Sequence, residues 1–145
     1  MEITLFEEKD LLACTNTFME VFNQEPWNDE WTKETAKNYL EDFTRTPGFK
    51  GIVAFNEEKM IGFLFGTLKH WWSGDEFFIN EMCVVADKQN SGIGTMMMNV
   101  LIKELESDGV SMISLLTDRG IPAEDFYKKH GFSEIERLVF LSRSM

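Results

Sequence analysis

Glu81 is the residue of this sequence whose setting most clearly suits chemistry. It interrupts a largely apolar run, Phe77 to Val85, of the kind that forms a strand buried on both faces. A carboxylate in such a strand costs free energy unless it is paired or has a function. A carboxylate in a buried strand can accept a proton from a reacting group, so Glu81 is a candidate general base. The alternatives are a structural ion pair, or a carboxylate at the rim of a cleft that only orients substrate.

A loop with two glycines follows this strand. Its sequence is Gln89-Asn90-Ser91-Gly92-Ile93-Gly94-Thr95, and a helical pattern begins within it. The first N–H groups of a helix have no intrahelical acceptor and lie at the positive end of the helix dipole. Glycine has no Cβ, so another group can come close to the backbone. The loop therefore predicts an anion site, and a pyrophosphate suits it.

Two common phosphate-binding motifs do not fit this loop. A P-loop has a lysine directly after its last glycine, and Thr95 follows Gly94 here. A dinucleotide-binding loop has a third glycine where Met97 stands, and it lies early in its fold, with an acidic residue after the next strand. The loop matches neither class.

The first half of the chain is expected to frame this strand with two helices and a hairpin. Apolar residues recur at helical spacing from Leu11 to Phe22 and again from Ala36 to Phe43. Thr32 is the expected cap of the second helix. The expected strands are an opening one and the two arms of a hairpin, at residues 3–6, 51–55 and 60–68.

The second half is expected to alternate strands and helices. A helix with a buried stripe from Ile93 to Leu105 ends at Gly109, and Pro122 opens a shorter helix that ends before Gly131. The expected strands lie at residues 77–85, 111–116, 132–135 and 138–141. This order indicates an α/β arrangement with parallel strands at its centre.

The length, net charge and cysteine content of the chain limit its possible functions. The 145 residues suit a single domain over residues 1–145. The net charge of −11 argues against a nucleic-acid partner, because phosphate binding needs a basic surface. No apolar stretch reaches the about 18–20 residues of a membrane span, and the first residues lack the basic region of a signal peptide. Cys14 and Cys83 match no metal spacing, so we expect a cytoplasmic protein with reduced thiols, no metal and no membrane contact.

Two motifs together resemble the GNAT family of N-acetyltransferases. Gln89-x-x-Gly92-x-Gly94 after a hydrophobic strand resembles the coenzyme A loop of that family. Ala123-x-x-Phe126-Tyr127-x-x-x-Gly131-Phe132 resembles its second signature. The resemblance is close over residues 77–135, and the earlier elements are compatible with it.

The resemblance implies an α/β (α+β) fold with a mixed central sheet of about six to seven strands and about four flanking helices. That sheet splays open between its fourth and fifth strands, where acetyl-CoA lies as co-substrate. The implied cofactor-binding residues are the loop residues, the preceding strand and one aromatic of the second motif: Met82, Cys83, Val84, Gln89, Asn90, Ser91, Gly92, Ile93, Gly94, Thr95 and Phe126. For Phe126, core packing is the alternative.

Tyr127 matches the tyrosine of the family that lies near the coenzyme A sulfur. The resemblance therefore makes it the candidate acid that protonates the departing thiolate. Without the motif, the default interpretation of Tyr127 is a half-buried aromatic on a short helix.

Two loops that face the acceptor in the resembling fold combine tryptophan with carboxylates. They span residues 25–31 and 70–76. Aromatic faces and acids suit a cationic amine. The candidate acceptor-binding residues are Glu25, Trp27, Asp29, Trp31 and Trp72. The alternative is that the tryptophans pack against the sheet and the acids are solvated.

The predicted function is therefore acetyl transfer from acetyl-CoA to a primary amine of a small, cationic acceptor, such as a polyamine or an aminoglycoside. The amine would attack directly in a ternary complex. The alternatives are a catalytically silent CoA-binding sensor or interaction module, and an acetyltransferase for protein N-termini or lysines. The resemblance does not fix the oligomeric state, and a homodimer is possible.

Overall fold

The computed structural model describes residues 1–145, which form two compact units, residues 1–115 and 116–145. The first unit contains the sheet and three α-helices, and the second contains one α-helix and the C-terminal segment. Each unit is described by itself. The expectation of one domain stays a prediction.

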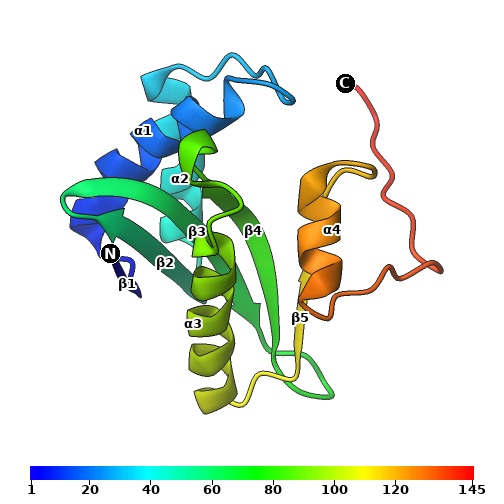
Figure 1. Ribbon diagram of the computed structural model, residues 1–145. Coiled ribbons are helices and arrows are strands. Elements are labelled where there is room, and N and C mark those ends of the chain that lie inside the picture. The colour runs from blue at the N-terminus through cyan, green and yellow to red at the C-terminus, as the bar shows by residue number, and fades with distance from the viewer. The chain divides into compact units, whose positions relative to one another are not determined.

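The first unit is built on a five-stranded sheet with its strands in sequence order (Figure 1). The first four strands pair antiparallel, and the last one pairs parallel to the fourth. The second and third form the expected hairpin. The strands are β1 (Glu2–Leu5), β2 (Phe49–Asn56), β3 (Lys59–Lys69), β4 (Glu76–Val84) and β5 (Met112–Leu115).

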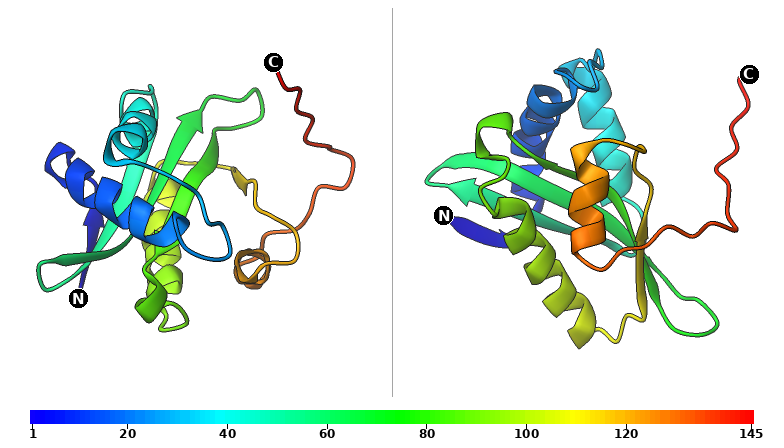
Figure 2. Two further views of the ribbon diagram at one scale, coloured as in Figure 1. Left: turned by 90° about the horizontal axis from the view of Figure 1, so that it is seen from above. Right: turned by 45° about the vertical axis from the view of Figure 1, so that its right-hand side comes forward.

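Helices cover both faces of this sheet (Figure 2). Phe63 of β3 meets Phe18 of α1, with ring centroids 6.5 Å apart. A Cβ on the neighbouring Gly62 would lie 3.3 Å from Met97 of α3, so α1 and α3 lie on opposite faces. The helices are α1 (Leu11–Phe22), α2 (Lys33–Thr44) and α3 (Ile93–Ser107), with 3₁₀ turns η1 (Glu8–Asp10) and η2 (Ala86–Lys88).

The start of α2 is capped as the sequence predicts. The Thr32 hydroxyl accepts a hydrogen bond from the Thr35 N–H at 3.1 Å, and the Thr35 hydroxyl accepts one from the Thr32 N–H at 2.9 Å. This reciprocal pair satisfies N–H groups at the end of the helix that have no intrahelical acceptor. It sets where α2 begins, and therefore which of its residues face the sheet.

A β-bulge lies in the middle of β4. Phe65 of β3 pairs with Glu81, but the next residue, Gly66, pairs with Ile79. Asn80 is therefore an extra residue on β4. Its side-chain oxygen accepts a hydrogen bond from the Thr67 hydroxyl at 2.8 Å.

The bulge changes which side chains of β4 face which helices. Without it, Ile79 and Glu81 would share a face, because side chains alternate along a strand. With it, Ile79 lies on the α3 face, opposite Gly66, and Glu81 lies on the face that α1 and α2 cover. The bulge thus directs Glu81 toward α2.

The pairing between β4 and β5 is short. It runs from Glu76 paired with Met112 to Ile79 paired with Leu115 and stops there. Beyond Ile79, no strand pairs with the edge of β4 on the β5 side. The sheet therefore opens between β4 and β5, as the resemblance implies.

The second unit contains α4 (Pro122–Lys129), which begins with proline as expected. The Glu124 side chain accepts a hydrogen bond from the Gly120 N–H at 2.8 Å, just before the helix. After the helix, Glu134 forms an ion pair with Arg119 at 2.6 Å.

The two strands expected at residues 132–135 and 138–141 are not formed, so the sheet has five strands rather than six or seven. A turn in which the Leu138 N–H donates to the Ile135 oxygen at 3.2 Å separates the two segments. The apolar pattern indicates strand propensity, but a strand exists only where its backbone groups find a partner strand. No helix of the protein has the length and apolar character needed to cross a membrane.

Candidate active site

Glu81 is held by a tyrosine of a neighbouring helix. The hydroxyl of Tyr39, on α2, donates a hydrogen bond to Glu81 Oε1 at 2.5 Å. The Glu81 side chain is half-buried, and this burial raises its pKa above the usual carboxyl range. The Tyr39 hydrogen bond opposes that shift, and the negative charge of Asp29 adds to it. A carboxyl group with a raised pKa is well suited to accept a proton.

Tyr39 itself lies in an aromatic cluster. Its ring stacks on Trp31 with centroids 5.2 Å apart and meets Phe43 edge-on at 4.9 Å. Burial, followed by the hydrogen bond and the negative charge of Glu81, raises the pKa of the Tyr39 hydroxyl. Tyr39 therefore stays protonated and acts as the donor. Sequence analysis missed it, although a hydroxyl-bearing ring on the apolar face of a helix is a usable signal.

The segment between α1 and α2 brings two predicted acceptor residues to this pair. The side chain of Asn23 bonds both backbone groups of Trp31, each at 2.9 Å. The indole N–H of Trp31 donates to Asp29 Oδ2 at 3.0 Å. Asp29, Trp31, Tyr39 and Glu81 thus form one connected group, which we call the acid–aromatic chain.

The other predicted acceptor residues make no direct hydrogen bond or ring contact with this chain, and Trp27 is linked to it through the rings of Phe22 and Phe18. The ring of Trp27 packs on Phe22 of α1 with centroids 4.8 Å apart, and Glu25 is exposed. Trp72 is 88% exposed in the loop between β3 and β4. That loop lies at the start of β4, whereas the glycine loop follows its end, and no hydrogen bond or ring contact joins Trp72 to the chain.

The glycine loop runs directly into α3. Gly92 is the N-cap of that helix with φ of 89°, a left-handed conformation that favours glycine. The first intrahelical bond goes from the Met96 N–H to the Gly92 oxygen at 3.0 Å. A Cβ at Gly92 would meet nothing within 4 Å, so the space beside this helix end is open. Ile93 and Gly94 occupy the first turn, where N–H groups point out of the helix.

The remaining loop residues turn the chain from β4 into this helix. The side-chain amide of Gln89 donates to the Val84 oxygen at 2.9 Å, and the Ser91 hydroxyl donates to the Lys88 oxygen. The N–H of Gln89 donates to the Ala86 oxygen at 3.3 Å, which engages it in the η2 turn. Asn90 has φ of 63°. The Gln89 N–H is therefore already engaged, and the first turn of α3 follows it in the chain.

Met82, Cys83 and Val84 lie on the part of β4 whose β5-side edge is unpaired. Cys83 is buried, and burial raises the pKa of its thiol well above the usual value. A thiol that resists ionisation is a poor nucleophile, so Cys83 acts as a core residue beside this edge.

Tyr127 lies on α4 of the second unit. It is half-buried, and its ring meets Phe126 at 5.4 Å and Phe132 at 5.7 Å, both edge-on. Phe126 also contacts His130 at 4.6 Å. The second motif thus forms a small aromatic cluster around the tyrosine.

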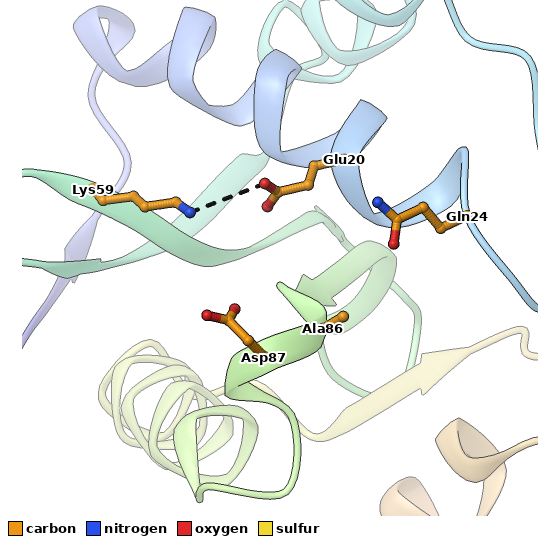
Figure 3. Close-up of a pocket in the computed structure, with 5 residues that line it drawn as sticks. All are labelled: Glu20, Gln24, Lys59, Ala86 and Asp87. Atoms are coloured by element: carbon orange, nitrogen blue, oxygen red, sulfur yellow. Dashed lines mark ion pairs between the residues drawn. The ribbon is translucent and has the colours of Figure 1, made fainter.

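A pocket of about 250 Å³ opens beside the end of β4 (Figure 3). Glu20 of α1, Gln24 just after that helix, Lys59 of β3, and Ala86 and Asp87 of η2 line it. Glu20 lies 4.0 Å from Lys59 in an ion pair. None of the predicted site residues lines this pocket.

Comparison with known families identifies the family of this chain. Residues 11–132 match the model of the acetyltransferase (GNAT) family. The chain belongs to this family. The match confirms the predicted acetyl-CoA-dependent N-acetyltransferase, and it extends over parts of both units of this GNAT chain.

Solved structures share the GNAT fold of this chain. A transcriptional regulator from Bacillus halodurans C-125 is 20% identical over 99% of both chains, with a TM-score of 0.79. An aminoglycoside acetyltransferase from an uncultured soil metagenomic sample, in complex with sisomicin, is 19% identical over 99% of this chain and 95% of that chain, with a TM-score of 0.78. An aminoglycoside N-acetyltransferase in complex with CoA is 14% identical over the same shares, with a TM-score of 0.77. These identities show the fold alone, and no curated protein matches the chain.

GNAT enzymes use acetyl-CoA, and two features of this chain fit that molecule. The unpaired edge of β4 at residues 82–84 offers backbone groups to an amide-bearing arm, as an added strand would use them. The open space at Gly92 gives a pyrophosphate access to the first turn of α3. This stretch of backbone is therefore a candidate site for an anionic group in a protein whose net charge is negative.

Proposed function

We propose that this GNAT protein acetylates a primary amine of a small, cationic acceptor, with Glu81 as the general base. The observation that carries the proposal is the acid–aromatic chain, which places a half-buried carboxylate beside an aromatic wall and a second acid. The ring face of Trp31 and the charge of Asp29 suit an ammonium group. Two fold relatives are named as aminoglycoside acetyltransferases, which makes polycationic amino sugars the first acceptors to test.

In this proposal, Glu81 and Tyr127 carry out the two proton transfers. Acetyl-CoA, when bound, supplies an acetyl thioester that an amine can attack. Glu81 takes a proton from the incoming ammonium and so frees the lone pair of its nitrogen. As the N–C bond forms and the C–S bond breaks, Tyr127 supplies the proton that the sulfur gains and recovers one from the nitrogen. Glu81 then returns its proton to solvent.

The backbone of residues 82–84 and the loop after Gln89 are proposed to hold acetyl-CoA. The loop residues that take part are Asn90, Ser91, Gly92, Ile93, Gly94 and Thr95. Their N–H groups would meet the pyrophosphate, and the strand edge would meet the pantetheine arm.

An acceptor screen tests this proposal. Release of the CoA thiol is followed with polyamines, aminoglycosides, amino acids, and peptides carrying a free N-terminus or a lysine. We expect turnover with a small polycation. Binding of acetyl-CoA without turnover of any amine would favour a sensor, and turnover of peptides alone would favour a protein acetyltransferase.

The role of Glu81 is tested with Glu81→Gln on the acceptor that turns over. We expect the loss of rate to be partly recovered at high pH, where more of the amine is already deprotonated. Gln can still accept the Tyr39 hydrogen bond, so the variant removes the base and keeps the contact. A loss that is equal at every pH would contradict the base role.

A further inference from the structure

Tyr39 reaches Glu81 across two elements that are far apart in sequence. It lies on α2, and Glu81 lies on β4 just after the bulge. The 2.5 Å bond between them is the only hydrogen bond to the Glu81 side chain. Both side chains are half-buried, so little water competes for this bond.

The Tyr39 ring is held in place independently of Glu81. Trp31 stacks on one side, Phe43 meets it edge-on, and Phe18 lies 5.7 Å away. The capping pair at Thr32 sets the start of the helix that carries it. The position of its hydroxyl is therefore preorganised before any ligand binds.

The hydrogen bond makes the two oxygens of Glu81 unequal. Oε1 accepts from Tyr39, and Oε2 has no partner within the protein. Every fully buried side-chain oxygen or nitrogen atom of the protein has a hydrogen-bond partner. Oε2 has no such partner, so it is exposed to solvent. Oε2 is thus the oxygen that an incoming group can reach.

We infer that Tyr39 is the positioning residue for Glu81: its hydroxyl holds Oε1 and leaves Oε2 to take the proton from the acceptor amine. This inference rests on the proposed role of Glu81 as the base. Within the acid–aromatic chain, Tyr39 then orients the base, whereas Asp29 and Trp31 bind the acceptor.

The charges around Glu81 predict the direction of the effect. Asp29 from the α1–α2 segment and Tyr39 from α2 are the titratable groups that act on Glu81. Glu81 in turn acts on Cys83 of β4, as do Cys14 and Glu20 of α1. Burial keeps both thiols neutral by raising their pKa, and Asp29 raises the pKa of Glu81. Tyr39 alone lowers that pKa, because its hydrogen bond stabilises the ionised carboxylate.

The test is Tyr39→Phe, which removes the hydroxyl and keeps the ring contacts. We expect the acidic limb of the pH profile of kcat/KM to move up by about one pH unit, which is about tenfold in rate below that limb. The KM for acetyl-CoA should stay unchanged. A wild-type profile with a wild-type rate would overturn the inference.

Two controls make the outcome specific. In a Glu81→Gln background, Tyr39→Phe should have no further effect, because a positioning residue acts only through its partner. An equal, additive loss in that background would overturn the inference.

The second control does not need an active enzyme. NMR titration of the Glu81 carboxyl, assigned by its loss in Glu81→Gln, should show a higher pKa in Tyr39→Phe than in the wild type. If no amine turns over, the proposed function fails, but this titration still decides whether Tyr39 holds Glu81. An unchanged titration would overturn the inference by itself.

Discussion

The side-chain amide of Gln89 donates to the backbone oxygen of Val84 at 2.9 Å, which fastens the glycine loop to the end of β4. The unpaired strand edge and the first turn of α3 are thereby held next to each other, rather than joined by a loose connection. We propose that a ligand with both an amide-bearing arm and a pyrophosphate binds to these two surfaces together. Coenzyme A has this combination of groups.

Replacing Gly92 tests this path. We expect Gly92→Glu to weaken acetyl-CoA binding by about 100-fold or more, because the side chain and its charge would enter the space proposed for the pyrophosphate. Gly109 provides the matched control, since it also has a positive φ, of 72°, and also has nothing within 4 Å of a Cβ. Gly109→Glu also places a glutamate at a positive φ, beyond the other end of α3, and should leave binding unchanged. Calorimetry with acetyl-CoA measures both, and equal affinities for the two variants would refute the assignment of the loop.

Local signals made much of this fold predictable from its sequence. The Thr32 cap, the hairpin and the glycine loop each follow from a few adjacent residues. The bulge at Asn80 was not predictable, because it depends on how β4 fits against β3 rather than on any turn residue. Since the bulge reverses the alternation of side chains, the partner of Glu81 could not be found by counting along the strand.

Other features lay beyond sequence reasoning for a related reason. The bond between Tyr39 and Glu81 joins residues from different elements, and no spacing rule links them. The strands expected at residues 132–135 and 138–141 are not formed. An apolar pattern indicates strand propensity, whereas a strand forms only where its backbone groups find a partner strand.

The raised pKa of Glu81 predicts a cost in stability. Because the folded state holds the Glu81 proton more tightly than the unfolded chain, the free energy of unfolding falls as pH rises through the raised pKa. Glu81→Gln removes this cost, so it should raise Tm at neutral pH, and the gain should disappear in acid, where wild-type Glu81 is protonated. Glu58→Gln, in the exposed β2–β3 turn, removes an equal charge and should give a much smaller change. A Glu81→Gln gain that is independent of pH would contradict the linkage.

Tyr127→Phe separates a chemical role from a packing role. The variant keeps the ring and therefore the contacts with Phe126 and Phe132. If the hydroxyl protonates the departing thiolate, kcat should fall by about 100-fold while the Kd for acetyl-CoA changes by less than about threefold. A kcat equal to that of the wild type would remove Tyr127 from the mechanism and leave it as part of the aromatic cluster of α4.

Asp29→Asn tests whether the protein recognises the acceptor by its positive charge. Asn can still accept the indole hydrogen bond of Trp31, so the variant removes charge and keeps the contact. We expect the KM of a polycationic acceptor to rise by about fivefold at low salt and the difference to shrink as salt is added, because screening weakens attraction at an exposed acid. Glu30→Gln, at the exposed neighbouring position, is the matched control and should change KM little.

Removing Asp29 also removes a negative charge that raises the pKa of Glu81, so the acidic limb of kcat/KM should move to lower pH. An unchanged KM together with an unmoved limb would place Asp29 outside the acceptor site.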